Sequence, residues 1–127
     1  MKKTVTLLGA LLLATGAQAE NPHKLTRLWE SEASLKVPEG VRYDAKRKVL
    51  YVSNIDGEPW ADDGKGSIGK LGLDGKVIAA EWVTGLSCPK GLALSKDGKW
   101  LYAADAGGIV VIGKGIYMPM QLYSYLH

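Results

Sequence analysis

The stretch that decides the fold is Pro38–Gly57, PEGVRYDAKRKVLYVSNIDG, because a second copy of it follows 51 residues later as PKGLALSKDGKWLYAADAGG, Pro89–Gly108. The ungapped alignment gives these identical pairs: Pro38 and Pro89, Gly40 and Gly91, Lys48 and Lys99, Leu50 and Leu101, Tyr51 and Tyr102, Gly57 and Gly108. An internal repeat with a period near fifty residues is typical of solenoids and propellers.

The pattern inside each copy is short and strand-like. The first copy has an apolar run at 40–43, a polar turn at 44–48 and a β-rich run at 49–53, and the second copy has the same order. Between the copies, Asp74 and Gly75 separate the apolar-rich runs 67–73 and 76–84, and Asp-Gly in this setting indicates a hairpin turn. The sequence therefore predicts four short strands per unit, joined as a meander.

Four antiparallel strands per unit, repeated radially, describe a β-propeller blade. The predicted fold class is all-β, a partial β-propeller of about two four-stranded antiparallel blades out of a probable six. We expect the large aromatic residues Tyr51, Trp82, Trp100 and Tyr102 to fill the space between neighbouring blades. The alternative is a small, unrelated β-sandwich.

The chain divides into five segments. Residues 1–19 have a positive start, a short apolar run and the small-residue pattern Ala17-Gln18-Ala19, which predict a signal peptide cut after Ala19 and a periplasmic or secreted protein with no membrane segment after cleavage. Residues 20–37 are a lead-in, 38–88 a first blade, 89–112 the start of a second blade, and 113–127 an atypical C-terminal tail. The tail is either an ordinary strand with an exposed end or the product of a frameshift or early stop.

In the lead-in, Thr26–Trp29 is predicted to form a strand that closes a propeller ring. The competing interpretation is a helix, because Leu25, Leu28, Trp29 and Ala33 would share one helical face. The strand is the preferred interpretation.

The charge of the chain is nearly balanced. The formal net charge of +3 includes Lys2 and Lys3, so cleavage after Ala19 leaves +1, which argues against a nucleic-acid partner. Cys88 is the single cysteine, so the chain has no internal disulfide, and a packing role beside Pro89 is predicted.

The loop 55–66 carries four carboxylates, which invites a calcium hypothesis: Asp56, Glu58, Asp62 and Asp63. Their spacing lacks the alternating ligand positions of a calcium loop, so a solvated turn is the preferred interpretation. Asn54 and Asp105 end their strands, where we expect them to cap turns.

Three segments, PEGVRYD, LYVSNIDG and GSIGKLGLDGKV, make the region from Leu28 to about Ile112 similar to the senescence-marker protein and gluconolactonase family of six-bladed propellers. The resemblance implies that Glu39 is a ligand of one catalytic divalent metal, calcium or zinc, in an enzyme that hydrolyses a sugar lactone or similar small-molecule ester. The family takes its other ligands, an Asn and an Asp, from later blades. The Asn belongs to a Pro-Asn-Gly motif, and the corresponding position in the second copy is Lys90.

Two functions follow as expectations. One is a truncated, exported, lactonase-like hydrolase whose activity would need further blades. The other is a non-catalytic periplasmic propeller module for binding or scaffolding, which self-associates through open blade faces because an unpaired blade exposes apolar surface.

Overall fold

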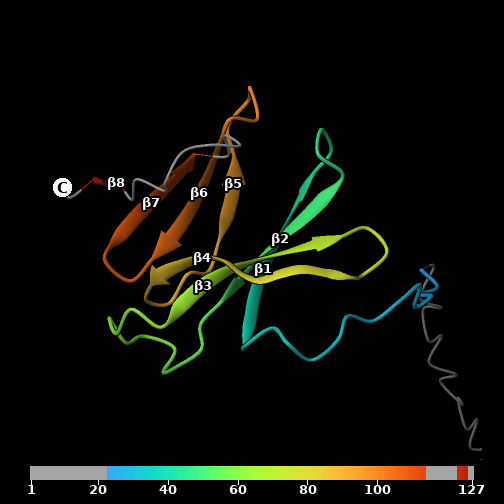
Figure 1. Ribbon diagram of the computed structural model, residues 1–127, viewed down its shortest axis with the longest axis horizontal. Helices are drawn as coiled ribbons and strands as arrows, with labels where there is room; N and C mark the ends of the chain where they lie inside the picture. The colour runs from blue at the N-terminus through green and yellow to red at the C-terminus, as the bar shows by residue number, and fades with distance from the viewer. Residues whose placement is uncertain (1–22, 114–122, 126–127) are drawn as a thin grey trace, which may run out of the picture.

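The computed structural model describes residues 23–113 and 123–125, and within them every regular element is a β-strand (Figure 1). The first antiparallel sheet has the order β1-β2-β3-β4 and the second β5-β6-β7-β8. The strands are β1 Pro38–Asp44, β2 Val49–Asn54, β3 Gly66–Gly72, β4 Val77–Leu86, β5 Leu92–Leu94, β6 Trp100–Asp105, β7 Gly108–Gly113 and β8 Tyr123–Tyr125. The all-β, antiparallel prediction is confirmed, whereas the arrangement as propeller blades stays a prediction.

The connections match the turn chemistry of the sequence. Gly75 has a φ of +83°, which an L side chain rarely adopts, and it follows Asp74 in the turn between β3 and β4. Asp74 Oδ1 accepts a hydrogen bond from the Lys76 amide at 3.1 Å, which closes the turn. The predicted Asp-Gly hairpin is therefore confirmed.

The two sheets share one apolar core. In the first sheet it contains Tyr51, fully buried, whose ring centre lies 5.0 Å from that of Trp82. In the second sheet it contains Leu101 and Ala103 of β6, also fully buried. The remaining buried members of this core are Val49, Ile68, Val83, Leu86, Val110 and Ile112. In Figure 1 the sheets lie next to each other, with β5 beside β1 and β2.

The sheets approach most closely at a glycine. A Cβ atom at Gly40 would lie 2.5 Å from the carbonyl oxygen of Lys90, so only a residue without a side chain fits there. Ser53 Oγ donates to the same Lys90 oxygen at 2.7 Å. Glycine in this part of β1 therefore lets the start of β5 dock against the first sheet.

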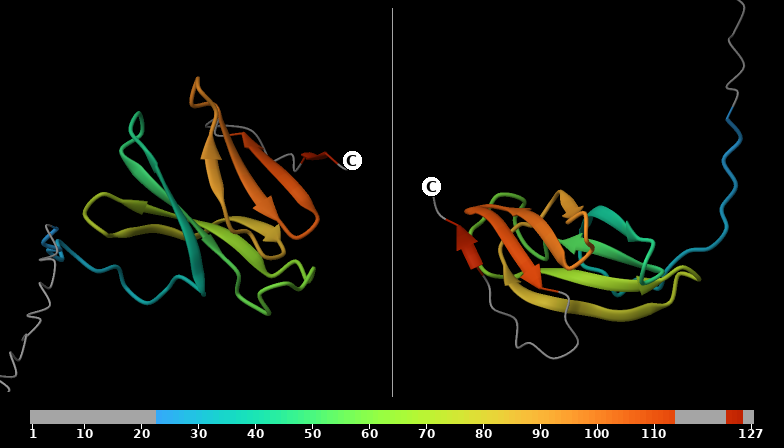
Figure 2. Two further views of the ribbon diagram at one scale, coloured as in Figure 1. Left: turned by 180° about the vertical axis from the view of Figure 1, so that it is seen from behind. Right: turned by 90° about the horizontal axis from the view of Figure 1, so that it is seen from above.

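The predicted strand at Thr26–Trp29 is wrong, since residues 23–32 adopt neither a strand nor a helix. Trp29 instead packs its ring over Gly75 in the turn of the β3–β4 hairpin. Figure 2 shows the lead-in running past this hairpin. The lead-in is tied down by two backbone hydrogen bonds, from Ile55 to Val37 at 3.2 Å and from Asp56 to Lys36 at 3.3 Å.

The aromatic residues divide between two environments. Tyr51 and Trp82 belong to the shared core region, as expected. Trp100 and Tyr102 lie on the face of β6 opposite to Leu101 and Ala103, so they do not fill the space between the two sheets, and Trp100 is 40% exposed.

The remaining segment predictions fall partly outside the described residues. The signal peptide at 1–19 lies wholly outside them, and most of the tail at 113–127 does as well. In the tail, Tyr123–Tyr125 pairs with Ile109–Val111 as β8, a fourth strand for the second sheet. Across residues 23–113 and 123–125 there is no helix of the length and apolarity needed to cross a membrane.

Candidate functional site

The candidate site lies where the chain enters the first strand of each sheet. Glu39 in β1 and Lys90, just before β5, occupy equivalent positions of the repeat, and their side chains meet with Nζ of Lys90 3.8 Å from Oε2 of Glu39. The Lys90 ammonium also lies 4.4 Å from the ring centre of Trp60, within the range of a cation–π contact. Trp60 belongs to the 55–66 loop, and its side chain is 81% exposed.

A hollow of about 220 Å³ opens beside this cluster. Trp60 and Lys90 form one part of its wall, and the end of β6 forms another through Ala104 and Asp105. Cys88 and Ala106 complete the wall. The hollow thus combines an aromatic surface, an ammonium and a carboxylate.

Asp105 fixes the connection between the sheets. Its carboxylate accepts hydrogen bonds from the Ser87 amide at 2.9 Å and from the Cys88 amide at 2.7 Å. Asp105 was predicted to cap the turn at the end of its strand, but the amides that its carboxylate accepts from belong to the link between β4 and β5. Cys88 is 3% exposed, in agreement with the predicted packing role.

Asn54 is buried at the end of β2 rather than exposed at a turn. Its amide nitrogen donates to Ser67 Oγ at 3.3 Å and to the Ala80 carbonyl at 3.2 Å. The side chain therefore joins β2, β3 and β4 inside the first sheet, where a turn-capping role does not apply.

Three of the four carboxylates of the 55–66 loop bind protein groups. Asp56 pairs with Lys36 at 2.9 Å, and this contact raises the pKa of the Lys36 ammonium. Asp62 accepts from Ser87 Oγ at 2.5 Å, and Asp63 accepts from the Lys65 amide at 3.0 Å. These three carboxylates are therefore engaged with protein groups, and the interpretation of the loop as a solvated turn stays a prediction.

The surroundings of Glu39 do not fit a divalent metal. A cation needs several oxygen or nitrogen ligands, and residues 23–113 contain no group of three or more His, Cys, Asp or Glu side chains placed to hold one. The Lys90 ammonium lies 3.8 Å from the Glu39 carboxylate and repels a cation. The role of Glu39 as a metal ligand stays a prediction that rests on the family resemblance.

The cluster itself was missed by the sequence analysis. The signal that could have found it is the repeat, because Glu39 and Lys90 have the same place in the two copies and lie at the starts of β1 and β5, which are neighbours. Trp60 gave no comparable signal, since it lies in a loop outside the repeated stretch.

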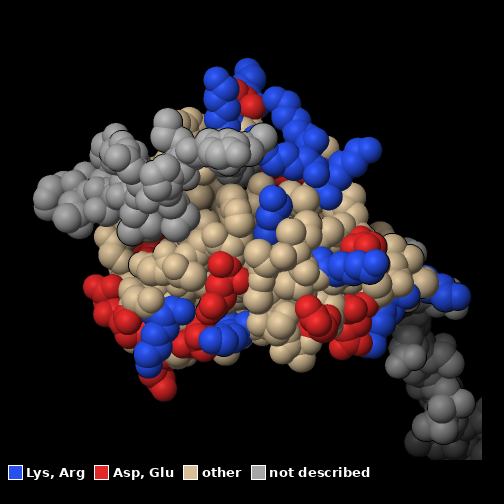
Figure 3. All heavy atoms as spheres, in the orientation of Figure 1, with Lys and Arg blue, Asp and Glu red and all other residues tan. Residues whose placement is uncertain are grey.

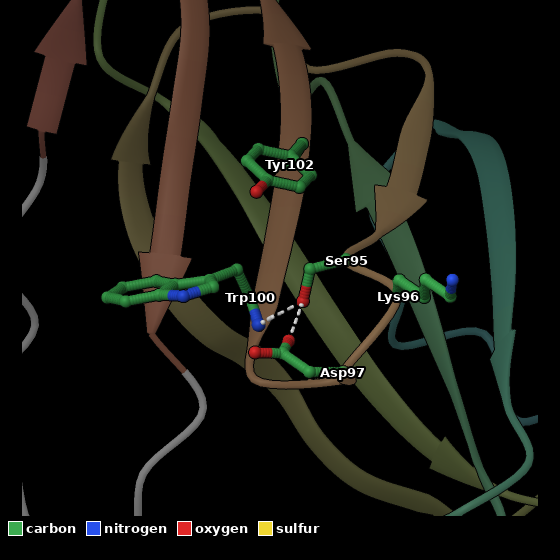
Figure 4. Close-up of a pocket in the computed structure, with 5 residues that line it drawn as sticks. All are labelled: Ser95, Lys96, Asp97, Trp100 and Tyr102. Atoms are coloured by element: carbon green, nitrogen blue, oxygen red, sulfur yellow. Dashed lines mark hydrogen bonds between the residues drawn. The ribbon is translucent and has the colours of Figure 1, made fainter.

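A second hollow, of about 540 Å³, lies on the outer face of β6 (Figure 4). Trp100 and Tyr102 form its apolar part, and the turn residues Ser95, Lys96 and Asp97 form its rim. Ser95 Oγ donates to Asp97 at 2.6 Å and accepts from the Trp100 amide at 3.0 Å, which holds the turn against the strand.

Comparison of the chain with protein-family models, curated proteins and solved structures gave no match.

Proposed function

We propose that the chain is a non-catalytic module of a partial β-propeller, which binds a small polyhydroxylated acid or lactone at the Glu39–Lys90–Trp60 cluster. The supporting observation is the ammonium of Lys90, held 4.4 Å from an exposed indole ring and 3.8 Å from a carboxylate. In the exported location that residues 1–19 predict, such a module would meet small solutes of the periplasm or the extracellular medium.

Each group has a definite task in this proposal. The apolar face of a sugar ring stacks on the Trp60 indole, which is exposed enough to receive it. Lys90 donates to a ligand carboxylate or carbonyl oxygen, and Glu39 accepts from a hydroxyl group. The salt bridge with Glu39 holds the Lys90 ammonium at the wall of the hollow before the ligand arrives, with the Glu39 carboxylate beside it.

Calorimetric titration of the full chain with gluconate and with glucono-lactone tests this proposal. We expect weak but saturable binding, at least tenfold weaker in Trp60→Ala, with Trp100→Ala as a matched control on the other hollow. Lys90→Ala should weaken the binding of gluconate, which is an anion, more than it weakens the binding of the neutral glucono-lactone. If neither ligand binds, or if Trp100→Ala removes binding while Trp60→Ala does not, the proposal is wrong.

The lactonase-like hydrolase is the second candidate, because Glu39 lies at the start of β1 and borders the same end of the molecule as the 55–66 loop. Titration with Ca²⁺ and Zn²⁺ distinguishes it from the binding module. Micromolar metal binding that is lost in Glu39→Gln would favour the hydrolase, whereas the binding module predicts no metal affinity that depends on Glu39.

A further inference from the structure

Equivalent residues of the two sheets point in the same direction. A side chain that lies between the sheets in one copy of the repeat therefore has its equivalent on an outer face in the other copy. Tyr51 is fully buried against the second sheet, whereas its repeat equivalent Tyr102 is only partly buried on the outer face of β6. Val49 is 7% exposed, whereas its equivalent Trp100 is 40% exposed. We call the surface formed by Trp100, Tyr102, Ile109 and Val111 the second open face.

On the outer face of the first sheet the relation is reversed, because there the residues of the first copy are exposed and their equivalents in the second copy are buried. Leu92 and Leu94 of β5 pack on the shared core, whereas their equivalents in β1, Val41 and Tyr43, are 65% and 49% exposed. Together with Leu50, these β1 residues form the first open face. The lead-in covers the first sheet on this side at Gly69, where Leu35 lies, and leaves Val41 and Tyr43 exposed.

A glycine on the second sheet points to the occupant of its open face. Gly40 is required because the Lys90 carbonyl packs against it, but at its repeat equivalent Gly91 no heavy atom of the described residues lies within 4 Å of a Cβ placed there. Gly91 also has no positive φ that would require glycine. Gly91 thus lies where another sheet could approach the second sheet as closely as the second sheet approaches Gly40. If that other sheet is the first sheet of another copy, the residue in the place of Lys90 is Glu39.

We propose that the second open face of one copy of this chain docks on the first open face of another copy, head to tail, in the manner in which the first sheet docks on the second within one chain. Tyr43 of one copy then packs on Trp100 and Tyr102 of the next, in the hollow of about 540 Å³. The carbonyl group of Glu39 then lies against Gly91 of the neighbouring copy.

A second copy is favoured as the occupant because the chain already contains the matching surface. The first open face carries Val41, Tyr43 and Leu50, the repeat equivalents of Leu92, Leu94 and Leu101, which already pack against the first sheet within one chain. The spacing of these residues along the strands therefore matches the second open face, although Val52, the equivalent of Ala103, is already buried. The two faces differ from each other, so the contact is heterologous. Repeated contacts give either a closed ring or an open chain of copies with one uncovered face at each end.

The contact between copies lacks two hydrogen bonds that join the sheets within one chain. Within the chain, Lys46 donates to the Asp97 carbonyl at 3.0 Å and Arg47 to the Gly98 carbonyl at 2.8 Å. The repeat equivalents of these two donors are Asp97 and Gly98 themselves, which cannot provide the same hydrogen bonds. Association between copies must therefore depend on apolar burial.

Charge at the turns opposes the contact. Lys and Arg side chains gather at the top of Figure 3, where the turns 44–48 and 95–99 lie, and docking brings these two turns of neighbouring copies together. Salt screens this repulsion and strengthens apolar burial, so we expect the association to become tighter as ionic strength rises. A contact held by salt bridges would show the opposite dependence.

Sedimentation of the full chain across a concentration series at low and high salt tests the proposal, with Gly91→Ala as the key variant. The added methyl group has open space within one chain but would meet the Glu39 carbonyl of the next copy, so it should weaken association at least tenfold and leave the circular dichroism spectrum unchanged. Gly107→Ala is the matched control, because a Cβ there also has no neighbour within 4 Å, and it should associate like the parent chain. A parent chain that stays monomeric at both salt concentrations would overturn the proposal.

Mixing two variants tests the polarity of the contact. Tyr43→Arg blocks the first open face and Tyr102→Arg blocks the second, so each variant alone should be monomeric, whereas an equimolar mixture should form a heterodimer through the intact face on each copy. Leu25→Arg, at a 95% exposed site in the lead-in, is the control and should associate normally. If Tyr102→Arg alone is monomeric while Tyr43→Arg still associates, the second open face binds itself and the head-to-tail contact is wrong.

Discussion

Tyr51 and Tyr102 are the same residue at the same place in the repeat, yet one is fully buried and the other lines an open hollow. The sequences around them differ little in apolar character. The difference arises because the second sheet covers the first on that side, and the described residues supply nothing equivalent beyond the second sheet. The pattern along a strand therefore determines which face of the sheet a side chain lies on. Whether that side chain is buried depends on whether another sheet packs against that face.

The largest expected effect comes from truncating these two tyrosines. Tyr51→Ala leaves a cavity between the sheets and should lower the free energy of unfolding by about 3–5 kcal/mol, whereas Tyr102→Ala in the monomer should cost about 1 kcal/mol or less. Urea denaturation at a dilute concentration measures both. Equal losses in the two variants would mean that the burial difference between the two faces is incorrect.

The two glycines give the next largest contrast. Gly40→Ala places a methyl group 2.5 Å from the Lys90 carbonyl oxygen, and the backbone must shift to accommodate it, at a cost of about 1–3 kcal/mol. Gly91→Ala should change the stability of the monomer by about 0.5 kcal/mol or less, because the methyl group meets nothing. The same denaturation series applies, and a neutral Gly40→Ala would contradict the close approach of the sheets.

A pH titration sharpens the comparison further. Burial raises the pKa of Tyr51 to about 12, with the nearby Asp44 carboxylate adding to the effect. Between pH 10 and 12 the unfolded chain loses this phenol proton while the folded chain keeps it, so stability is complete below pH 10 and falls as pH rises through 12. We expect a loss on the order of 1–2 kcal/mol across this range, which Tyr51→Phe should remove. A parent chain whose stability falls no more than that of Tyr51→Phe would indicate that Tyr51 is accessible to water.

The smallest effect is expected at the turns. Arg47 donates to Asp44 Oδ2 at 3.1 Å and to the Gly98 carbonyl, and Arg47→Ala removes both contacts. Because the side chain is 36% exposed, we expect a loss of only about 1 kcal/mol. Lys99→Ala, in the outer turn, is the control and should be neutral. A larger loss for Lys99→Ala would show that the outer turn carries the stability instead.

The sequence predicted the strands and the Asp74-Gly75 turn because alternation, turn residues and the repeat are local signals. It did not predict the irregular course of Thr26–Trp29, since pairing of that segment depends on a sheet edge that local sequence does not reveal. It also missed the Glu39–Lys90 salt bridge, which forms across 51 residues only once the sheets have docked. Contacts between distant elements depend on which sheet packs against which, and the residue pattern within one strand carries no information about that packing.

Cys88 lies in the link between the sheets with a 3% exposed side chain, and its amide is held by Asp105. A thiol reagent reaches it only when this link opens, so the rate at which the native chain is labelled reports the free energy of that local opening. Because Cys88 is the single cysteine, its labelling rate measures the opening of the link between the two sheets without a mutation to introduce a thiol.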